Sequence, residues 1–224
     1  MKKIFLTFFL FLSAITITFA QDGNLGLFLG ASYYNGEINP DKILFMPSPV
    51  IGLFYRHNFN NRWALRIEGN YTTLRGSDSK YNNAYQQWRN YNFTTRLGDL
   101  GAGMEFNFLK YNKHKYSEFY FSPYVFLGTM ILVIPDPKYP FEFSFPAAVG
   151  FKYALTKKTT IAIEWSYRWT YSDRLDGIKE DNFYHKPYRM QYSYNPDNDW
   201  YSFIGVSISY ELFKNTQECP AIFQ

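Results

Sequence analysis

Cysteine and histidine are scarce in this sequence of 224 residues, which has one cysteine, Cys219, and three histidines. A single cysteine excludes an internal disulfide, and the scattered histidines offer no metal-ligand spacing. No Walker-type or dinucleotide-binding glycine pattern occurs either. The sequence therefore predicts neither a metal site nor a cofactor.

A large excess of one charge is also missing. The chain has 23 basic and 19 acidic residues, and removal of two N-terminal lysines with a signal peptide leaves 21 basic residues, a net charge of about +2. This balance argues against a nucleic-acid partner. Beyond Ala20 no apolar run is long enough to cross a bilayer as a helix, yet 22% of the residues are aromatic. A membrane, if one is involved, is crossed by strands.

The N-terminus has the three-part pattern of a secretory signal peptide. Two lysines precede an apolar run over residues 4–12, and small residues lead to Ala20. We therefore predict a signal peptide over 1–20, a single barrel domain over 21–213 and a tail over 214–224. No cysteine lies near the cleavage point, which argues against lipoprotein processing.

Eight segments alternate between apolar and polar residues, as strands with two different faces do. The clearest is "IAIEWSYRWTYS", in which every second residue is large and apolar or aromatic. The segments lie near Leu25–Tyr34, Val50–Asn58, Trp63–Thr73, Leu97–Phe108, Phe119–Ile131, Phe141–Leu155, Thr160–Ser172 and Tyr201–Leu212. Each is long enough for a tilted membrane strand.

The polar face of these segments carries charges of both signs together with most of the glycines. Its charged members are Arg56, Arg66, Glu68, Glu105, Lys152, Glu164, Arg168 and Glu211. In a barrel they share one lumen, where mutual pairing offsets their desolvation, while inward glycines leave room for large neighbours. The alternation also suits a soluble β-sandwich or lipocalin-like barrel, but aromatic residues near the segment ends favour interfacial girdles in a membrane.

The predicted fold is all-β: an eight-stranded antiparallel up-and-down transmembrane outer-membrane β-barrel with long extracellular loops and short periplasmic turns. The expected short turns are 59–62, 109–116 and 156–158, and the expected long loops are 35–49, 74–96, 132–140 and 173–200. This parity predicts periplasmic N- and C-termini in a bacterial outer membrane. Pro123 and Pro146 lie inside predicted strands, where we expect a bulge or a strand end.

Several pieces of the chain, in order, resemble one known family. They are "YYNGEINP" (33–40), "GLFYRHNFNNRWALR" (52–66), "GSDS" (76–79), "EFNF" (105–108), "FSPYVFLG" (121–128), "EWSYRWTYSDRLD" (164–176), "NDWYSFIGVSISY" (198–210) and "CP" (219–220). Together they resemble the PorG-type outer-membrane β-barrel proteins of the Bacteroidetes type IX secretion system. The resemblance implies a barrel without catalytic activity that accompanies a periplasmic ring of a PorK-type lipoprotein and a PorN-type protein.

The expected function is therefore to anchor or position that ring from the outer membrane. Candidate partner-binding residues are Cys219, Pro220, Ile222 and Phe223 of the tail and Lys110, Lys113 and Lys115 of the basic turn. The lone thiol can join a cysteine of another protein, and the apolar end can dock; the alternative is a disordered tail with a free thiol.

Two other functions compete with this hypothesis. A rim hydrolase acting on lipid or protein could use the polar residues of the fourth loop, which are Asp173, Asp176, Glu180, Asp181, His185, Asp197 and Asp199. No spacing assigns roles to these residues, so no catalytic residue is predicted. A passive, membrane-stabilising barrel is the other alternative. Solute transport is disfavoured because eight strands enclose little more than their own side chains.

Overall fold

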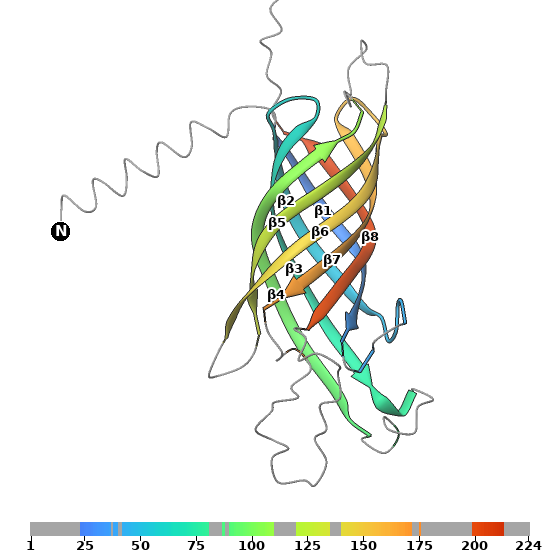
Figure 1. Cartoon of the computed structure of the whole chain (residues 1–224). Coiled ribbons are helices and arrows are strands. Elements are labelled where there is room, and N and C mark those ends of the chain that lie inside the picture. Colours follow the sequence, from blue (N-terminus) through green and yellow to red (C-terminus); the bar gives the residue numbers. More distant parts are fainter. Residues whose placement is uncertain are drawn as a thin grey trace, which may run out of the picture.

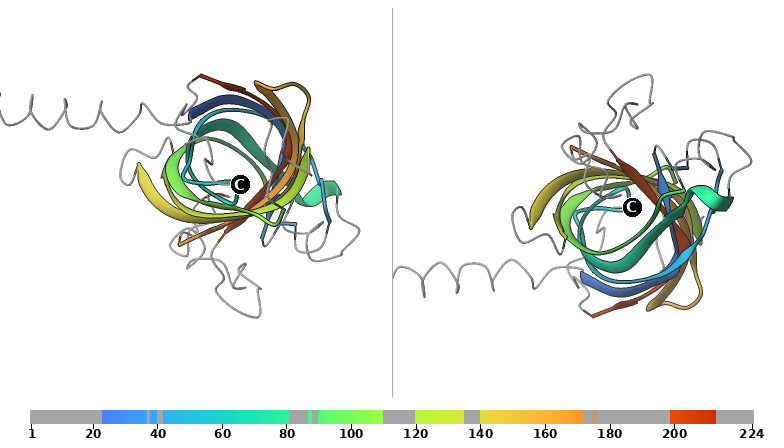
Figure 2. Two further views of the ribbon diagram at one scale, coloured as in Figure 1. Left: turned by 90° about the horizontal axis from the view of Figure 1, so that it is seen from above. Right: turned by 90° about the horizontal axis from the view of Figure 1, so that it is seen from below.

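The computed structural model describes residues 23–36, 38–39, 42–80, 87, 90–109, 120–134, 140–171, 175 and 199–212. In this part of the chain, eight antiparallel strands form a closed barrel (Figures 1 and 2), with β8 pairing back onto β1. The strands are β1 (Gly23–Asn35), β2 (Ser48–Asn58), β3 (Trp63–Ser77), β4 (Asn92–Asn107), β5 (Phe121–Val133), β6 (Phe141–Ala154), β7 (Thr159–Thr170) and β8 (Trp200–Glu211). A 3-10 turn, η1 (Asp78–Lys80), follows β3. Nowhere in the described residues does a helix reach the length and hydropathy of a membrane span.

The two ends of the barrel differ in their connections. We call the end with the tight connections 59–62 and 155–158 the turn end; β1 begins there and β8 finishes there (Figure 1). The opposite end, the loop end, carries the connections 36–47, 78–91, 134–140 and 171–199. The eight predicted segments agree with the observed strands in number and order.

One predicted turn differs from the structure. The connection expected at 109–116 spans 108–120, because the β4–β5 ladder ends at the pair Asn107 and Tyr124. It is longer than the 134–140 connection at the loop end. The lysine-rich segment has no alternating pattern that could extend the ladder. The β4–β5 connection at the turn end is therefore longer than the β5–β6 connection at the loop end, the reverse of the prediction.

The two tight turns are stabilised by side chains that replace backbone partners. The Asn60 side-chain oxygen accepts hydrogen bonds from the backbone N–H groups of Arg62 (2.8 Å) and Trp63 (2.9 Å). The Thr156 hydroxyl accepts hydrogen bonds from the N–H groups of Lys158 (3.2 Å) and Thr159 (3.0 Å). Asn and Thr favour turns because their short polar side chains reach the backbone two or three residues away.

The register of the ladders gives the stagger of the barrel. Starting at Phe143 and following paired residues through β5, β4, β3, β2, β1, β8 and β7 returns to β6 at Tyr153, ten residues further along. Such a stagger requires strands that tilt relative to the barrel axis, as Figure 1 shows. With eight strands the interior is about as wide as the side chains that fill it.

Side chains alternate between the lumen and the outer wall, as predicted. On β7, Glu164 and Arg168 are buried, whereas Ile163 is 56% exposed and Trp165 is 44% exposed. The aromatic residues near the segment ends, which favour interfacial girdles, are likewise mostly exposed on the outer wall. The exposed ones are Trp63, Tyr120, Tyr153, Trp165, Trp169, Tyr171 and Tyr210. An apolar, aromatic wall around a charged interior is the arrangement of a membrane barrel and is the reverse of a soluble one.

Inward glycines make room for aromatic rings, as the sequence predicts. A Cβ on Gly26 would lie 2.2 Å from the Phe54 ring, and a Cβ on Gly150 would lie 2.5 Å from the Tyr124 ring. At Gly30 the obstacle is backbone, because a Cβ would lie 2.2 Å from the carbonyl oxygen of Ile204. Closing β1 against β8 therefore depends on the absence of a side chain at this position.

The expectation of a bulge at the strand prolines is wrong for Pro146. Ladder pairing between β5 and β6 stops after Leu127 with Ala147 and resumes at Met130 with Ser144 in the same register. Proline lacks the N–H that the ladder needs, and here the ladder has a gap without an inserted residue. Pro123 is the third residue of β5 and lies near a strand end, as expected.

We predict that Gly30→Val lowers the free energy of unfolding of the barrel by about 1–3 kcal/mol, because the new side chain overlaps the β8 backbone. Gly98→Val is the matched control: a Cβ there meets only the carbonyl oxygen of Asn70, at 3.7 Å. Urea unfolding of the protein in lipid vesicles measures both variants. Equal stability of Gly30→Val and the wild type would show that β1 and β8 are not packed as described.

Candidate functional site

The lumen holds a network of buried charges centred on Arg66 of β3. Its guanidinium donates to both carboxylate oxygens of Glu164 on β7, at 2.5 and 2.8 Å, and to Glu68 at 2.5 Å. Glu105 of β4 lies 3.6 Å away. The Phe126 ring lies 4.3 Å from the guanidinium carbon, a cation–π distance. Arg66 thus ties opposite walls of the barrel together.

A second group of charges meets at Glu105, nearer the turn end. Its carboxylate accepts hydrogen bonds from Arg56 Nε of β2, at 3.1 Å, and from Lys152 Nζ of β6. The Lys152 ammonium also donates to the Asn107 side-chain oxygen at 3.0 Å and lies 4.3 Å from the centre of the Tyr124 ring. Every polar contact of Lys152 that is described here lies inside the lumen.

The third group surrounds Arg168 of β7, nearer the loop end. Arg168 donates to Asp99 at 2.5 Å and to Glu68 at 2.7 Å, so that Glu68 bridges two arginines. Asp99 also accepts hydrogen bonds from the Asn70 amide at 2.8 Å and from the Tyr201 hydroxyl at 3.0 Å. One further strand, β8, is thereby joined to the network.

The charges of this network balance. Its cations are Arg56, Arg66, Lys152 and Arg168, and its anions are Glu68, Asp99, Glu105 and Glu164. All eight residues are buried. Removing a charge from water costs several kcal/mol, which only good ionic geometry offsets, so the balance of signs is a physical requirement. The described lumen is filled with paired charges and is not an open pore.

The sequence predicts seven members of the network. It also places Glu211 in the lumen, and Glu211 is buried there at the turn end, beside Asn24 of β1. The missed member is Asp99. A signal for it exists in the sequence, since Asp99 has the same parity as Glu105 in the strand over 97–108.

An apolar cap closes the lumen at the loop end. Its buried residues are Phe28, Tyr34, Ile38, Val50, Leu74, Phe93, Leu97, Leu132, Ile134, Leu175, Tyr201 and Phe203. Asp199 fixes this cap, because its carboxylate accepts hydrogen bonds from the Tyr34 hydroxyl (2.5 Å) and from the backbone N–H of Leu175 (2.7 Å). Two loop residues, Ile38 and Leu175, belong to this cap, and Asp199 holds Leu175 in it.

The residues considered for a rim hydrolase are described only in part. Asp199 is buried, and both of its carboxylate oxygens serve the cap, which is a structural role. Asp173, Asp176, Glu180, Asp181, His185 and Asp197 lie outside the described residues, as do the partner-binding candidates Lys110, Lys113, Lys115, Cys219, Pro220, Ile222 and Phe223. Within the described residues, no group of His, Cys, Asp and Glu side chains is placed to hold a metal ion.

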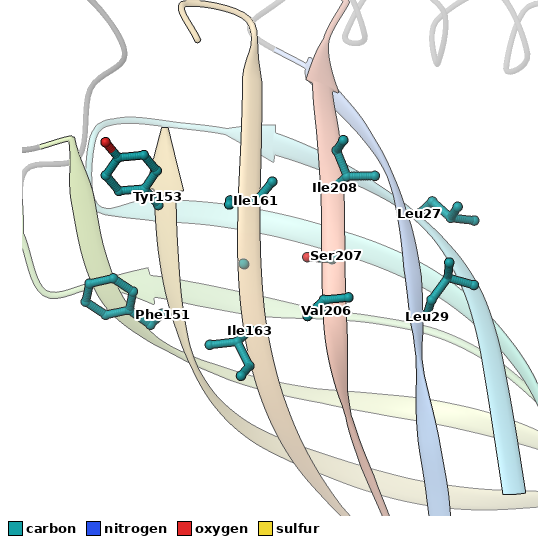
Figure 3. A pocket seen from close by; sticks show the side chains of 10 residues that line it. Leu27, Leu29, Phe151, Tyr153, Ile161, Ile163, Val206, Ser207 and Ile208 are labelled. Carbon is teal, nitrogen blue, oxygen red and sulfur yellow. The ribbon is translucent and has the colours of Figure 1, made fainter. Parts of the chain in front are cut away.

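The outer wall has a shallow apolar groove of about 370 Å³ over β6, β7, β8 and β1 (Figure 3). Phe151, Ile163, Val206 and Leu29 project into it from the four strands. Its lining has no carboxylate, imidazole, amine or thiol, so the groove offers no acid–base chemistry. It belongs to the membrane-facing surface.

Over residues 2–221 the sequence matches the family described as a domain of unknown function (DUF6089). The chain belongs to the DUF6089 family. No curated protein matches this DUF6089 chain significantly.

Solved structures similar to this DUF6089 barrel are bacterial outer-membrane proteins. Neisserial surface protein A (NspA) is 9% identical with a TM-score of 0.50, covering 84% of this chain and 96% of its own. Ail, the attachment invasion locus protein of Yersinia pestis, is 13% identical (TM-score 0.44; 85% and 99% covered). OprG from Pseudomonas aeruginosa is 9% identical (TM-score 0.42; 85% and 97% covered). These likenesses concern the fold alone. The closed barrel of eight antiparallel strands and its likeness to NspA confirm the predicted eight-stranded antiparallel outer-membrane β-barrel.

We predict that Arg66→Met destabilises the DUF6089 barrel by about 3–5 kcal/mol, because Glu68 and Glu164 then keep buried charges without their central partner. The exposed Arg62 in the tight turn is the matched control, and Arg62→Met should change stability by no more than about 0.5 kcal/mol. Equilibrium unfolding in vesicles, followed by tryptophan fluorescence, measures the difference. A loss at Arg66 as small as that at Arg62 would contradict the network.

Proposed function

We propose that this DUF6089 barrel is a non-enzymatic outer-membrane component of the type IX protein secretion system. In this proposal it anchors or positions a periplasmic ring built from a PorK-type lipoprotein and a PorN-type protein. The support is the resemblance of its sequence to PorG-type barrels, together with a confirmed barrel fold whose lumen is filled. A filled lumen favours a role as an anchor over a role as a conduit.

The resembling pieces of sequence supply much of the interior of the barrel. "GLFYRHNFNNRWALR" contains Arg56 and Arg66, and "EFNF" contains Glu105. "EWSYRWTYSDRLD" begins with Glu164 and includes Arg168. Residues of the apolar cap come from three pieces, "YYNGEINP", "EWSYRWTYSDRLD" and "NDWYSFIGVSISY". The resemblance therefore covers five of the eight network residues and part of the apolar cap, and it is the observation that carries the proposal.

The proposed orientation has the turn end in the periplasm and the loop end outside the cell. Outer-membrane barrels usually have short turns in the periplasm. In this barrel the start of the first strand, β1, and the end of the last strand, β8, both lie at the turn end. In this orientation, a periplasmic partner can reach the tight turns, the 108–120 connection and the tail. Lys110, Lys113 and Lys115 are proposed contacts in that connection.

Crosslinking tests both the partner and its side. A photoreactive residue replacing Lys157 in the tight turn of the turn end should capture ring proteins in intact cells, because this turn is fully exposed at the proposed periplasmic end. The same residue at Ile43, exposed at the loop end, is the control and should not capture them. Capture from the loop end alone would reverse the orientation. Absence of ring proteins from both positions, with secretion intact after deletion of the barrel, would favour a passive membrane-stabilising role.

Cys219 gives a second, independent prediction. An unpaired cysteine in an oxidising compartment can form an intermolecular disulfide, and Ile222 and Phe223 beside it offer apolar contact. We expect non-reducing electrophoresis of membranes with trapped thiols to reveal a larger, reductant-sensitive species that the Cys219→Ser variant lacks. Identical migration of the two proteins would rule out a covalent link to the ring lipoprotein and would leave docking through Ile222 and Phe223.

A further inference from the structure

The outward face of the β3–β4 hairpin differs from the rest of the wall at the loop end. On β6, β7 and β8 the wall ends in the aromatic residues Phe141, Trp169 and Trp200. On β3 and β4 the outward residues change from apolar to polar, and the strands continue beyond the other strands (Figure 1). At the loop end, the wall of β3 and β4 therefore presents polar side chains where the wall of β6, β7 and β8 presents aromatic ones.

Two arginines and two threonines form a patch on this hairpin. In the ladder, Thr73 pairs with Arg96 and Arg75 pairs with Thr94. The two arginines are therefore diagonal neighbours on one face, with Cα atoms about 7–8 Å apart. Both arginines and Thr94 are exposed, and Thr73 is partly buried. We call these four residues the arginine patch.

In the part of the chain that the structure describes, the arginine patch has donors but no acceptor carboxylate on its face. The outward positions of β3 and β4 carry no Asp or Glu, and the neighbouring outward positions of β2 and β5 carry none either. Among the described residues, the salt bridges involve neither Arg75 nor Arg96. The acids that are close in sequence are buried: Asp78 accepts a hydrogen bond from the backbone N–H of Tyr91, and Asp99 accepts one from Arg168 in the lumen. The patch is thus complementary to an anion.

An apolar depression lies directly on the membrane side of the patch. It has a volume of about 620 Å³ and is lined by Ile51, Leu53, Gly69, Tyr71 and Leu100, among others. From Arg75, the outward residues of β3 run Thr73, Tyr71, Gly69, so the depression begins at the first outward position beyond the patch. A molecule with an anionic head and long apolar chains can contact both features at once.

Gly69, the outward-facing glycine of this depression, is not required by the packing of the barrel. A Cβ on Gly69 would meet its nearest atoms at 3.4 and 3.6 Å, which is ordinary contact, and its backbone has no left-handed conformation. The inward Gly30, in contrast, faces backbone at 2.2 Å. Gly69 therefore keeps the outer wall hollow without a structural need inside the barrel.

From these observations we propose that the arginine patch and the depression below it bind a phosphorylated lipid of the leaflet that faces the loop end. Arg75 and Arg96 would hold the phosphate through charge-assisted hydrogen bonds, since guanidinium matches phosphate geometry and remains charged. The acyl chains would lie against Gly69, Tyr71 and Leu100. The site is independent of the proposed ring partner, because it lies on the wall at the opposite end.

The test is native mass spectrometry of the detergent-purified protein with two probes of equal acyl length, a diphosphorylated lipid A and zwitterionic phosphatidylcholine. We expect wild type to bind the diphosphorylated lipid more tightly. The Arg75→Gln/Arg96→Gln double variant should bind it about tenfold more weakly, a loss of about 1.4 kcal/mol. Arg62→Gln, which removes an exposed arginine at the turn end, is the matched control and should bind like wild type.

A second variant tests the apolar part of the site. Gly69→Leu fills the depression and should weaken binding of both lipids while leaving the charge patch intact. Circular dichroism of every variant checks that the barrel is folded. The proposal is overturned if the double variant binds as wild type does, if Arg62→Gln loses as much affinity, or if inorganic phosphate binds as tightly as the lipid, which would identify an anion site without a lipid.

Discussion

The pairing of Arg66 with Glu68 and Glu164 is the interaction on which the rest of this barrel depends. It joins β3 to β7 across the lumen, and Glu68 and Glu105 extend the contact to Arg168, Arg56 and Lys152. Each of these charges is withdrawn from water and is stable only with its partner in place. A shift of one strand by a single residue would turn its charges toward the membrane, so the network specifies the register as well as the closed state.

A lumen filled in this way limits what the protein can do. The network occupies the middle of the barrel, and the cap held by Asp199 closes the loop end. The lumen therefore offers no path through the membrane. Contacts with other molecules must be made by the ends and the outer wall. In the two proposals, the turn end attaches a periplasmic complex and the β3–β4 sector binds a lipid. Both roles use a rigid barrel as a fixed support in the membrane.

Most of the fold is predictable from the sequence because a strand with one face in lipid and one in a lumen has a strict alternation. That alternation identifies the strands and the facing of Arg66, Glu164 and most of the other charged residues. It does not identify which charge meets which, because pairs such as Arg66 and Glu164 are 98 residues apart and are brought together by the tilt of the strands. The cap is not predictable either: Leu175 and Asp199 meet through loop conformation, which has no periodic signal. The expectation for Pro146 is wrong because the ladder tolerates a gap in place of a bulge.

The central claim is that the barrel is a closed, filled support. Conductance across a planar bilayer that contains the purified wild-type protein tests this claim most directly. The account predicts no steady ion conductance for the wild type at moderate voltage, because paired side chains and the apolar cap occupy the lumen. A stable, reproducible open channel in the wild type would contradict the account.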